Sequence, residues 1–166
     1  MFQLSDFFHL WAYEAAATQK VLSRLTDESL QQEVTPQNWT LGRIAWHTVS
    51  AIGNIASHID LSIDGPTNDY PVPTSAAHIS NTYQQASHSL VQAIKEQLSE
   101  ENLSEQLNLF GRTMAKRDVL LLLIQHQTHH RGQMTILMRQ AGLSVPGLYG
   151  PSKEEWAEIG MEAPIM

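Results

Sequence analysis

The sequence contains no cysteine, and this absence limits the chemistry available to the protein. It excludes disulfide bonds, thiolate metal ligands and a cysteine nucleophile. A site for a transition metal must therefore be built from imidazole nitrogens and oxygen atoms. Basic residues are also few, with 10 Lys and Arg against 17 Asp and Glu and a net charge of -7. Because a nucleic-acid binder needs a basic face to contact phosphates, we expect no nucleic-acid partner.

Long apolar runs are missing as well. No stretch approaches the roughly 20 apolar residues of a membrane span. The amino-terminal Met1-Phe-Gln-Leu-Ser lacks the basic segment, apolar core and cleavage site of a signal peptide. We therefore expect a soluble, cytoplasmic protein with no membrane partner. The 166 residues suffice for one hydrophobic core and show no internal repeat, so residues 1–166 are predicted to form a single domain.

Apolar residues recur at helical spacing in four segments, and period-two runs of strand length are absent. The first two predicted helices run from about Leu4 to Leu25 and, after the N-cap Thr40, from about Leu41 to Ile59. The other two run from about Ser75 to Leu98 and from a cap at Thr113 to Ala141, before the C′ residue Gly142. The predicted fold class is all-α, a four-helix bundle.

The connections between these helices differ in length. Residues Leu61 to Thr74 contain three prolines and a glycine, so they cannot be helical and are too long for a tight turn. We predict one long crossover connection here, between the second and third helices, running along the bundle. Thr26–Gln37 is predicted to be a loop with one short turn, and Ser99–Arg112 a polar connection. Ser152-Lys-Glu-Glu155 is a capping box that starts a short C-terminal helix through Trp156.

The motif His126-Gln-Thr-His-His130-Arg-Gly-Gln133 follows the apolar run Val119–Ile124. Residues four apart on a helix share a face, so His126 and His130 stack within an apolar stripe. A single inward histidine is usually a hydrogen-bonded core residue, and that interpretation stays open here. Two buried imidazoles without partners are costly, however, and a bound metal ion removes that cost.

The neighbours of this pair are predicted to play other parts. His129 falls on an edge with Asp118, Gln125 and Gly132, so we expect it not to bind the metal. Arg131 is expected to be an exposed residue near the helix end, with orientation of an anionic substrate as the alternative.

A third ligand must come from elsewhere, and His47 is the best candidate. It lies on the inferred inner face of its helix, after Ile44 and before the small residues Ser50 and Ala51, which leave space beside the imidazole. His58 shares that face but lies roughly 16 Å away, so one ion cannot reach both. We expect the remaining histidines to be solvated: His9, His78 and His88.

Three imidazoles without a thiolate suit a divalent ion, zinc or nickel above all, with copper and iron left open. A catalytic site of this kind has three protein ligands and one open position. The predicted metal ligands are His47, His126 and His130.

The motifs around these residues resemble those of the DinB/YfiT-like metalloprotein family. The resemblance rests on the Trp-His context of Ile44-Ala-Trp-His47, on His126-x-x-x-His130-Arg-Gly-Gln133, and on the ending Arg139–Leu143 followed by Pro146–Pro151. It covers essentially the whole chain. It implies a four-helix bundle with a long crossover and a divalent metal bound by three histidines, which fall on His47, His126 and His130. The wider superfamily includes enzymes that use low-molecular-weight thiols, such as bacillithiol S-transferases and a mycothiol-dependent maleylpyruvate isomerase.

The expected function is that of a metal-dependent enzyme, a low-molecular-weight-thiol S-transferase or a related hydrolase. Its partner would be a small-molecule substrate, with a homodimer left open. No general base is predicted, because Gln133 and Asn54 cannot take a proton, His129 is only a candidate, and Tyr149 is near in sequence alone. The alternative is non-enzymatic: the metal would staple a bundle that serves as a binding or stress-response module, and a fourth protein ligand would favour it.

Overall fold

The computed structural model describes residues 2–109 and 111–165 and confirms the predicted all-α four-helix bundle. Met1, Met166 and Phe110, which belongs to the predicted polar connection, lie outside the described residues. The four long helices of the bundle are α1 (Leu4–Leu22), α2 (Leu41–Ser57), α3 (Ala76–Gln97) and α4 (Lys116–Gln140). Helices α1 and α4 run in one direction, and α2 and α3 in the other.

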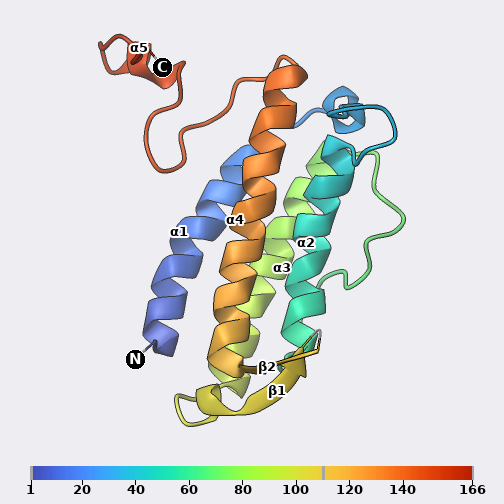
Figure 1. Cartoon of the computed structure of the whole chain (residues 1–166), viewed down its shortest axis with the longest axis vertical. Coiled ribbons are helices and arrows are strands. Elements are labelled where there is room, and N and C mark those ends of the chain that lie inside the picture. Colours follow the sequence, from blue (N-terminus) through green and yellow to red (C-terminus); the bar gives the residue numbers. More distant parts are fainter. Residues whose placement is uncertain (1, 110, 166) are drawn as a thin grey trace.

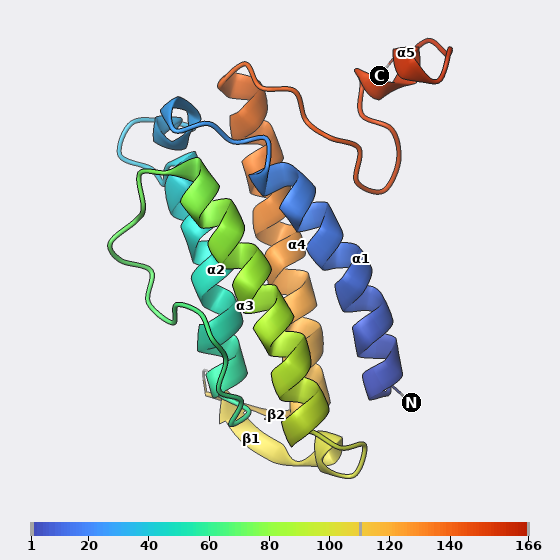
Figure 2. The same ribbon diagram turned by 180° about the vertical axis from the view of Figure 1, so that it is seen from behind.

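The long crossover is present where the sequence predicts it. Residues 61–75 contain no helix or strand and run along the bundle from the end of α2 to the start of α3 (Figure 2). Such a connection is required because α2 and α3 are parallel, so the chain must return the length of the bundle between them. It also places crossover residues beside the middle of α2.

The predicted capping residues Thr40 and Gly142 are confirmed, and the third helix starts next to the predicted Ser75. Thr40 caps α2, with its hydroxyl accepting from the Arg43 amide at 3.1 Å, and Ser75 caps α3 through the His78 amide at 3.3 Å. Gly142 follows α4 with φ +76°, the left-handed conformation that glycine adopts without strain. Helices α1 and α2 end two to three residues before the predicted Leu25 and Ile59, because the last turn of each tightens to i→i−3 hydrogen bonds.

The predicted start of the fourth helix at Thr113 is wrong. A hairpin of β1 (Gln106–Leu109) and β2 (Arg112–Ala115) precedes α4, and Thr113 lies within β2 opposite Asn108. Ala115 is the N-cap residue of α4, and its amide donates to the Asp118 carboxylate at 3.1 Å. Gln106–Leu109 alternates polar and apolar residues, but a single run of four is the shortest that indicates a strand, and the surrounding polar stretch predicts a connection instead.

Three short helical segments complete the chain. The turn predicted between α1 and α2 is the 3-10 helix η1 (Glu28–Gln31), and η2 (Asn102–Ser104) lies before β1. The C-terminal helix α5 (Glu155–Glu158) begins later than the capping box predicts. Half of that box forms, because the Ser152 amide donates to the Glu155 carboxylate at 3.0 Å, but the Ser152 hydroxyl has no partner.

The core lies between the four long helices, and α2 packs most extensively against α4. Large, fully buried side chains come from all four helices, among them Phe7, Trp11, Ile52, Tyr83, Leu90 and Leu137. Within the described residues, no helix combines the length and the apolar character needed to cross a membrane. Because α2 packs most extensively against α4, polar side chains that lie between these two helices need an explanation.

Candidate metal centre

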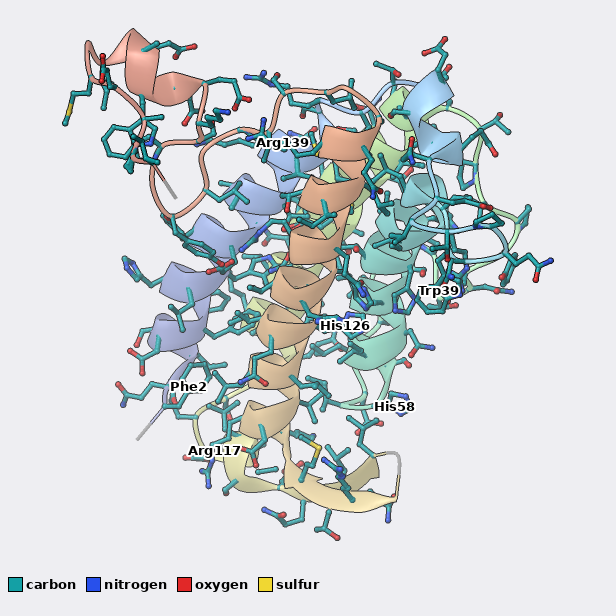
Figure 3. All side chains as sticks on the ribbon, turned by 45° about the horizontal axis from the view of Figure 1, so that its top comes forward. Phe2, Trp39, His58, Arg117, His126 and Arg139 are labelled. Carbon is teal, nitrogen blue, oxygen red and sulfur yellow. The ribbon has the colours of Figure 1, made fainter. Side chains whose placement is uncertain are left out.

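Three histidines converge between α2 and α4. His47 comes from the middle of α2, and His126 and His130 come from successive turns of α4, as their spacing of four predicts. The Nε2 atom of His126 lies 3.2 Å from that of His47 and 3.3 Å from that of His130. One ligand atom from each residue lies within 4.8 Å of the others. Figure 3 shows His126 on the side of α4 that faces α2.

Two of the three rings are oriented by acceptors behind them. The Nδ1 atom of His47 lies 3.0 Å from the Asp69 carboxylate, and Nδ1 of His130 lies 2.7 Å from the Gln133 amide oxygen. Because these oxygens can only accept, both Nδ1 atoms donate, and both Nε2 atoms carry lone pairs directed at His126. Outer-shell acceptors of this kind fix the tautomer and orientation of metal-binding histidines.

Because the three Nε2 atoms converge, at least one of their lone pairs is left without a hydrogen-bond donor. The His126 Nε2 atom can donate one hydrogen, so it can satisfy the lone pair of His47 or of His130 but not both. The Nδ1 atom of His126 is buried and has no hydrogen-bond partner. A divalent cation between the three Nε2 atoms would satisfy all of them, since nitrogens bound about 2.0–2.1 Å from a tetrahedral zinc lie roughly 3.3 Å apart. The three residues therefore fit a metal ion.

Burial favours the neutral form of His126 and of His130. Burial, and then the proximity of His130 and His47, lowers the pKa of His126 from 6.5 to about 4. Burial also lowers the pKa of His130, against the hydrogen bond to Gln133. Neutral imidazoles are the form that binds metal, so at neutral pH the centre is ready to do so.

Asp69 stays ionised beside this centre. Burial alone would raise its pKa, but hydrogen bonds from Ser50, His47 and Arg43 outweigh it and lower the pKa to about 2. The Arg43 guanidinium donates to Asp69 at 2.9 Å and lies over the rings of Trp39 and Tyr70, at 5.0 and 4.7 Å from their centroids. The crossover therefore supplies a fixed negative charge behind His47.

A cavity of about 500 Å³ opens beside His47 and His126. Ala51, one of the small residues after His47 that predict open space, lines its α2 wall together with Asn54 and Ile55, and Leu122 contributes from α4. The rest of the wall comes from the crossover: Thr67, Asn68, Asp69 and Tyr70. We call it the crossover cavity. It gives a small molecule access to the histidines.

Among the described residues, the group that could hold a metal contains none of the other sequence-predicted residues. His129 is exposed, although its ring lies 4.9 Å from that of His130, and His9, His58, His78 and His88 are exposed too. Asn54 lines the crossover cavity, whereas Gln133 serves as the acceptor behind His130. The Tyr149 hydroxyl donates to the Glu14 carboxylate at 2.8 Å.

The expectation that Arg131 is exposed is wrong. Its side chain is 1% exposed and donates to the Glu14 carboxylate, to the Glu14 carbonyl at 2.9 Å, to the Thr18 hydroxyl at 3.0 Å and to the Tyr149 hydroxyl. Gln127 extends this buried network, accepting from Thr18 at 3.1 Å and from Tyr83 at 2.6 Å. Helix α4 packs against α1 as well as α2, so it has a second buried face that a single apolar stripe does not reveal.

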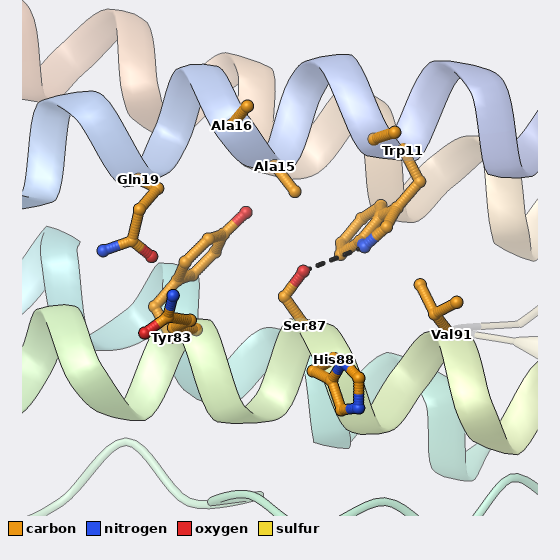
Figure 4. Close-up of a pocket in the computed structure, with 10 residues that line it drawn as sticks. Trp11, Ala15, Ala16, Gln19, Tyr83, Ser87, His88 and Val91 are labelled. Atoms are coloured by element: carbon orange, nitrogen blue, oxygen red, sulfur yellow. Dashed lines mark hydrogen bonds between the residues drawn. The ribbon is translucent and has the colours of Figure 1, made fainter.

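A further cavity, of about 340 Å³, lies between α1 and α3 (Figure 4). Ala15 and Ala16 on α1 lie across from Tyr83 and Ser87 on α3, and the Trp11 indole donates to the Ser87 hydroxyl at 3.0 Å. Its walls bring together no cluster of titratable groups. We therefore place the candidate function at the histidines.

Sequence reasoning missed the outer residues of the centre. Asp69 and Arg43 gave no periodic signal, because Asp69 lies in the proline-rich coil and meets His47 only through the path of the crossover. The separation of Gln133 from His130, three residues on one helix, was a usable signal for their hydrogen bond.

Comparison with known proteins agrees with this architecture. The profile of the DinB family matches residues 1–163. The chain is 61% identical over 167 residues to the "Uncharacterized protein YrdA" of Bacillus subtilis, covering 100% of both chains. The crystal structure of a DinB-like protein from Bacillus cereus is 50% identical and superposes with a TM-score of 0.86, over 90% of this chain and 100% of that one. A DinB-like protein of Bacillus subtilis, YjoA, is 19% identical with a TM-score of 0.65, over 86% of this chain and 98% of that one, and shows the shared fold. With its whole-length match and its four-helix bundle, this chain belongs to the DinB family.

Proposed function

We propose that the protein is a metal-dependent enzyme, a low-molecular-weight-thiol S-transferase or a related hydrolase, whose divalent ion is held by His47, His126 and His130. The observation that carries this proposal is the meeting of three Nε2 atoms beside an accessible cavity. The all-imidazole donor set suits zinc or nickel. Among the described residues, the group that could hold the ion contains these three side chains and no fourth.

When bound, the ion would lower the pKa of a thiol or water molecule that reaches it and stabilise the resulting anion. The chain's own residues prepare that step. Asp69 and Gln133 hold His47 and His130 in one orientation, so the centre needs little rearrangement to bind. Hydrogen bonds from Ser50, His47 and Arg43 keep Asp69 ionised, and the ion pair with Arg43 also holds it in place. Asn54 and Asn68 offer amide groups to the polar part of a substrate in the crossover cavity.

The competing function is a metal-stapled, non-enzymatic module, and one observation supports it. The three histidines belong to two helices, so a bound ion would link α2 to α4 and brace the bundle. The two functions differ in the fourth ligand: an enzyme keeps a position for water or substrate, while a closed structural site fills it with a protein side chain.

The test begins with metal analysis of protein purified without chelator. We expect up to one divalent ion per chain, and X-ray absorption spectroscopy should find three imidazoles and one exchangeable ligand. A screen of thiols with electrophiles, and of hydrolysable esters and amides, should then find turnover that a chelator abolishes. A fourth protein ligand, with no turnover in the screen, would favour the staple.

A further inference from the structure

One side of the bundle carries no exposed charge along most of its length. Residues 76–94, nearly all of α3, include no Asp, Glu, Lys or Arg, and the only charged residue among 7–19 of α1 is Glu14. The Glu14 carboxylate turns away from this side, because it pairs with the buried Arg131 of α4. Figure 2 shows α1 and α3 side by side, with the crossover beside α2 and the C-terminal segment beyond α1. We call this side the α1–α3 face, and its exposed side chains include Ala12, Ala16, Asn81, Gln84 and His88.

The middle of the α1–α3 face is hollow. The cavity of about 340 Å³ between the two helices opens there, and Ala12 and Ala16 leave the space free because their side chains end at Cβ. Figure 4 shows Trp11 and Val91 on facing helices at one end of the cavity. A second surface packed against this face would remove these apolar walls from water, which is favourable.

The polar groups of the α1–α3 face can pair with copies of themselves. An Asn or Gln amide carries both a donor and an acceptor, and so does a neutral imidazole. Asn81, Gln84 and His88 are all of this kind. A face of lysines could only donate and a face of carboxylates could only accept, so neither would pair with its own copy. The α1–α3 face is therefore chemically complementary to itself.

The distribution of charge also favours a second copy as the partner. With a net charge of -7, two copies of the chain repel each other, and they approach at the lowest cost through a face without charge. The cores of protein interfaces are likewise depleted in charged residues. Helix α1 carries Asp6 in its first turn and Lys20 in its last turn, followed by the exposed Arg24. A twofold axis at right angles to α1 would place Asp6 of one copy at the basic end of the other.

We infer that the α1–α3 face is the interface of a homodimer, in which each helix packs antiparallel to its counterpart and the two cavities close against each other. The three candidate metal ligands lie on α2 and α4, and no residue of α1 or α3 lines the crossover cavity. The dimer therefore forms without metal, and its interface leaves the crossover cavity uncovered.

Sedimentation equilibrium over a series of concentrations tests this inference. The wild type should reach twice the 18.6 kDa of one chain, with or without a chelator. Gln84→Glu should raise the dissociation constant of the dimer roughly tenfold or more, because it adds a charge to both copies and replaces a group that pairs with itself by one that only accepts. Ala16→Glu should do the same from α1. Gln125→Glu, the same amide-to-carboxylate change at an exposed position of α4, is the matched control and should dimerise as the wild type does.

A cross-linking experiment locates the interface. Because the chain has no cysteine, a single introduced cysteine is the only thiol present. A short bismaleimide should join two copies of His88→Cys, on the α1–α3 face, and leave Gln125→Cys as single chains on a denaturing gel. Circular dichroism should show that all these variants are folded.

Three results would overturn the inference. A wild type that is monomeric at every concentration would leave the face to a different partner. A dimer that Gln125→Glu dissociates more than Gln84→Glu, or that cross-links through Gln125→Cys and not through His88→Cys, would place the interface on α4. A dimer that a chelator dissociates would make a metal ion the link between the copies.

Discussion

Two polar clusters occupy different sides of α4, and the adjacent residues His130 and Arg131 belong to one each. In the first, three imidazoles turn their lone pairs toward one another. In the second, Arg131 and Glu14 neutralise each other, and both guanidinium Nη atoms have acceptors. Buried polar groups that satisfy one another hold a fold together, whereas groups left unsatisfied in a common direction indicate a missing ligand. We therefore interpret Arg131 as a residue that stabilises the fold and the three histidines as candidate metal ligands.

The largest effect should come from removing a histidine. His126→Ala deletes the nitrogen nearest to both other ligands, so metal analysis should fall from up to one ion per chain to almost none. His129→Ala is the matched control, because His129 is exposed on the same helix. This variant should keep its metal. Circular dichroism should show both variants folded. Full occupancy in His126→Ala, or equal loss in the two, would remove the distinction between these histidines.

Replacing Arg131 should lower the stability of the fold and leave metal binding unchanged. Arg131→Met leaves the largely buried Glu14 without its ion-pair partner, which should lower the free energy of unfolding by about 3–5 kcal/mol. Denaturation in urea measures this change, and the folded variant should still bind one metal ion. Arg112→Met, at an exposed position, should change little. The double variant Glu14→Gln/Arg131→Met should recover part of the loss, and metal loss in folded Arg131→Met would contradict the assignment.

The two clusters also differ in how far the sequence reveals them. His126 and His130 were visible because a spacing of four on a helix fixes their relation, and the small residues after His47 predicted open space. Arg131 was misjudged because one apolar stripe was assumed, whereas α4 also buries Gln127 and Arg131, which contact Tyr83 on α3 and Glu14 on α1. Asp69 was missed because it meets His47 only through the tertiary path of an irregular segment. The β1–β2 hairpin was missed because the alternation in β1 covers just four residues. Local periodicity was readable, and contacts between distant irregular segments were not.

Removing the metal should lower the stability that the histidine cluster contributes and leave the Arg131–Glu14 cluster unchanged. An ion that binds the folded state alone stabilises it by about 2.7 kcal/mol at a hundredfold excess over its dissociation constant. A chelator should therefore lower the melting temperature of the wild type by several degrees, since ~1 kcal/mol corresponds to roughly 2–4 °C for a domain of this size. His47→Ala should already melt lower and respond little to chelator. An undiminished chelator shift in His47→Ala would show that His47 is only a core residue.

A smaller effect should follow from the acceptor behind His47. Asp69→Ala removes the oxygen that fixes the His47 tautomer, which should weaken metal affinity by roughly 10–100-fold without abolishing it. Competition with a chromogenic chelator measures this affinity. Asp64→Ala, an exposed carboxylate on the same crossover, is the control and should bind as the wild type does. Affinity equal to that of the wild type in Asp69→Ala would mean that the His47 ring is oriented by its packing alone.

The smallest effect concerns pH in the metal-free protein. Burial lowers the pKa of folded His126 to about 4, below the 6.5 of a free imidazole, so between these values the unfolded chain binds a proton that the folded chain does not. The free energy of unfolding should therefore fall as pH decreases from about 6.5 toward 4, and His126 should add no slope above that window. The lowered pKa of His130 acts in the same direction. Urea denaturation at a series of pH values should show a shallower slope in His126→Ala and an unchanged one in His88→Ala, whose imidazole is exposed. A slope that persists fully in His126→Ala would mean that acid sensitivity does not arise at the candidate metal centre.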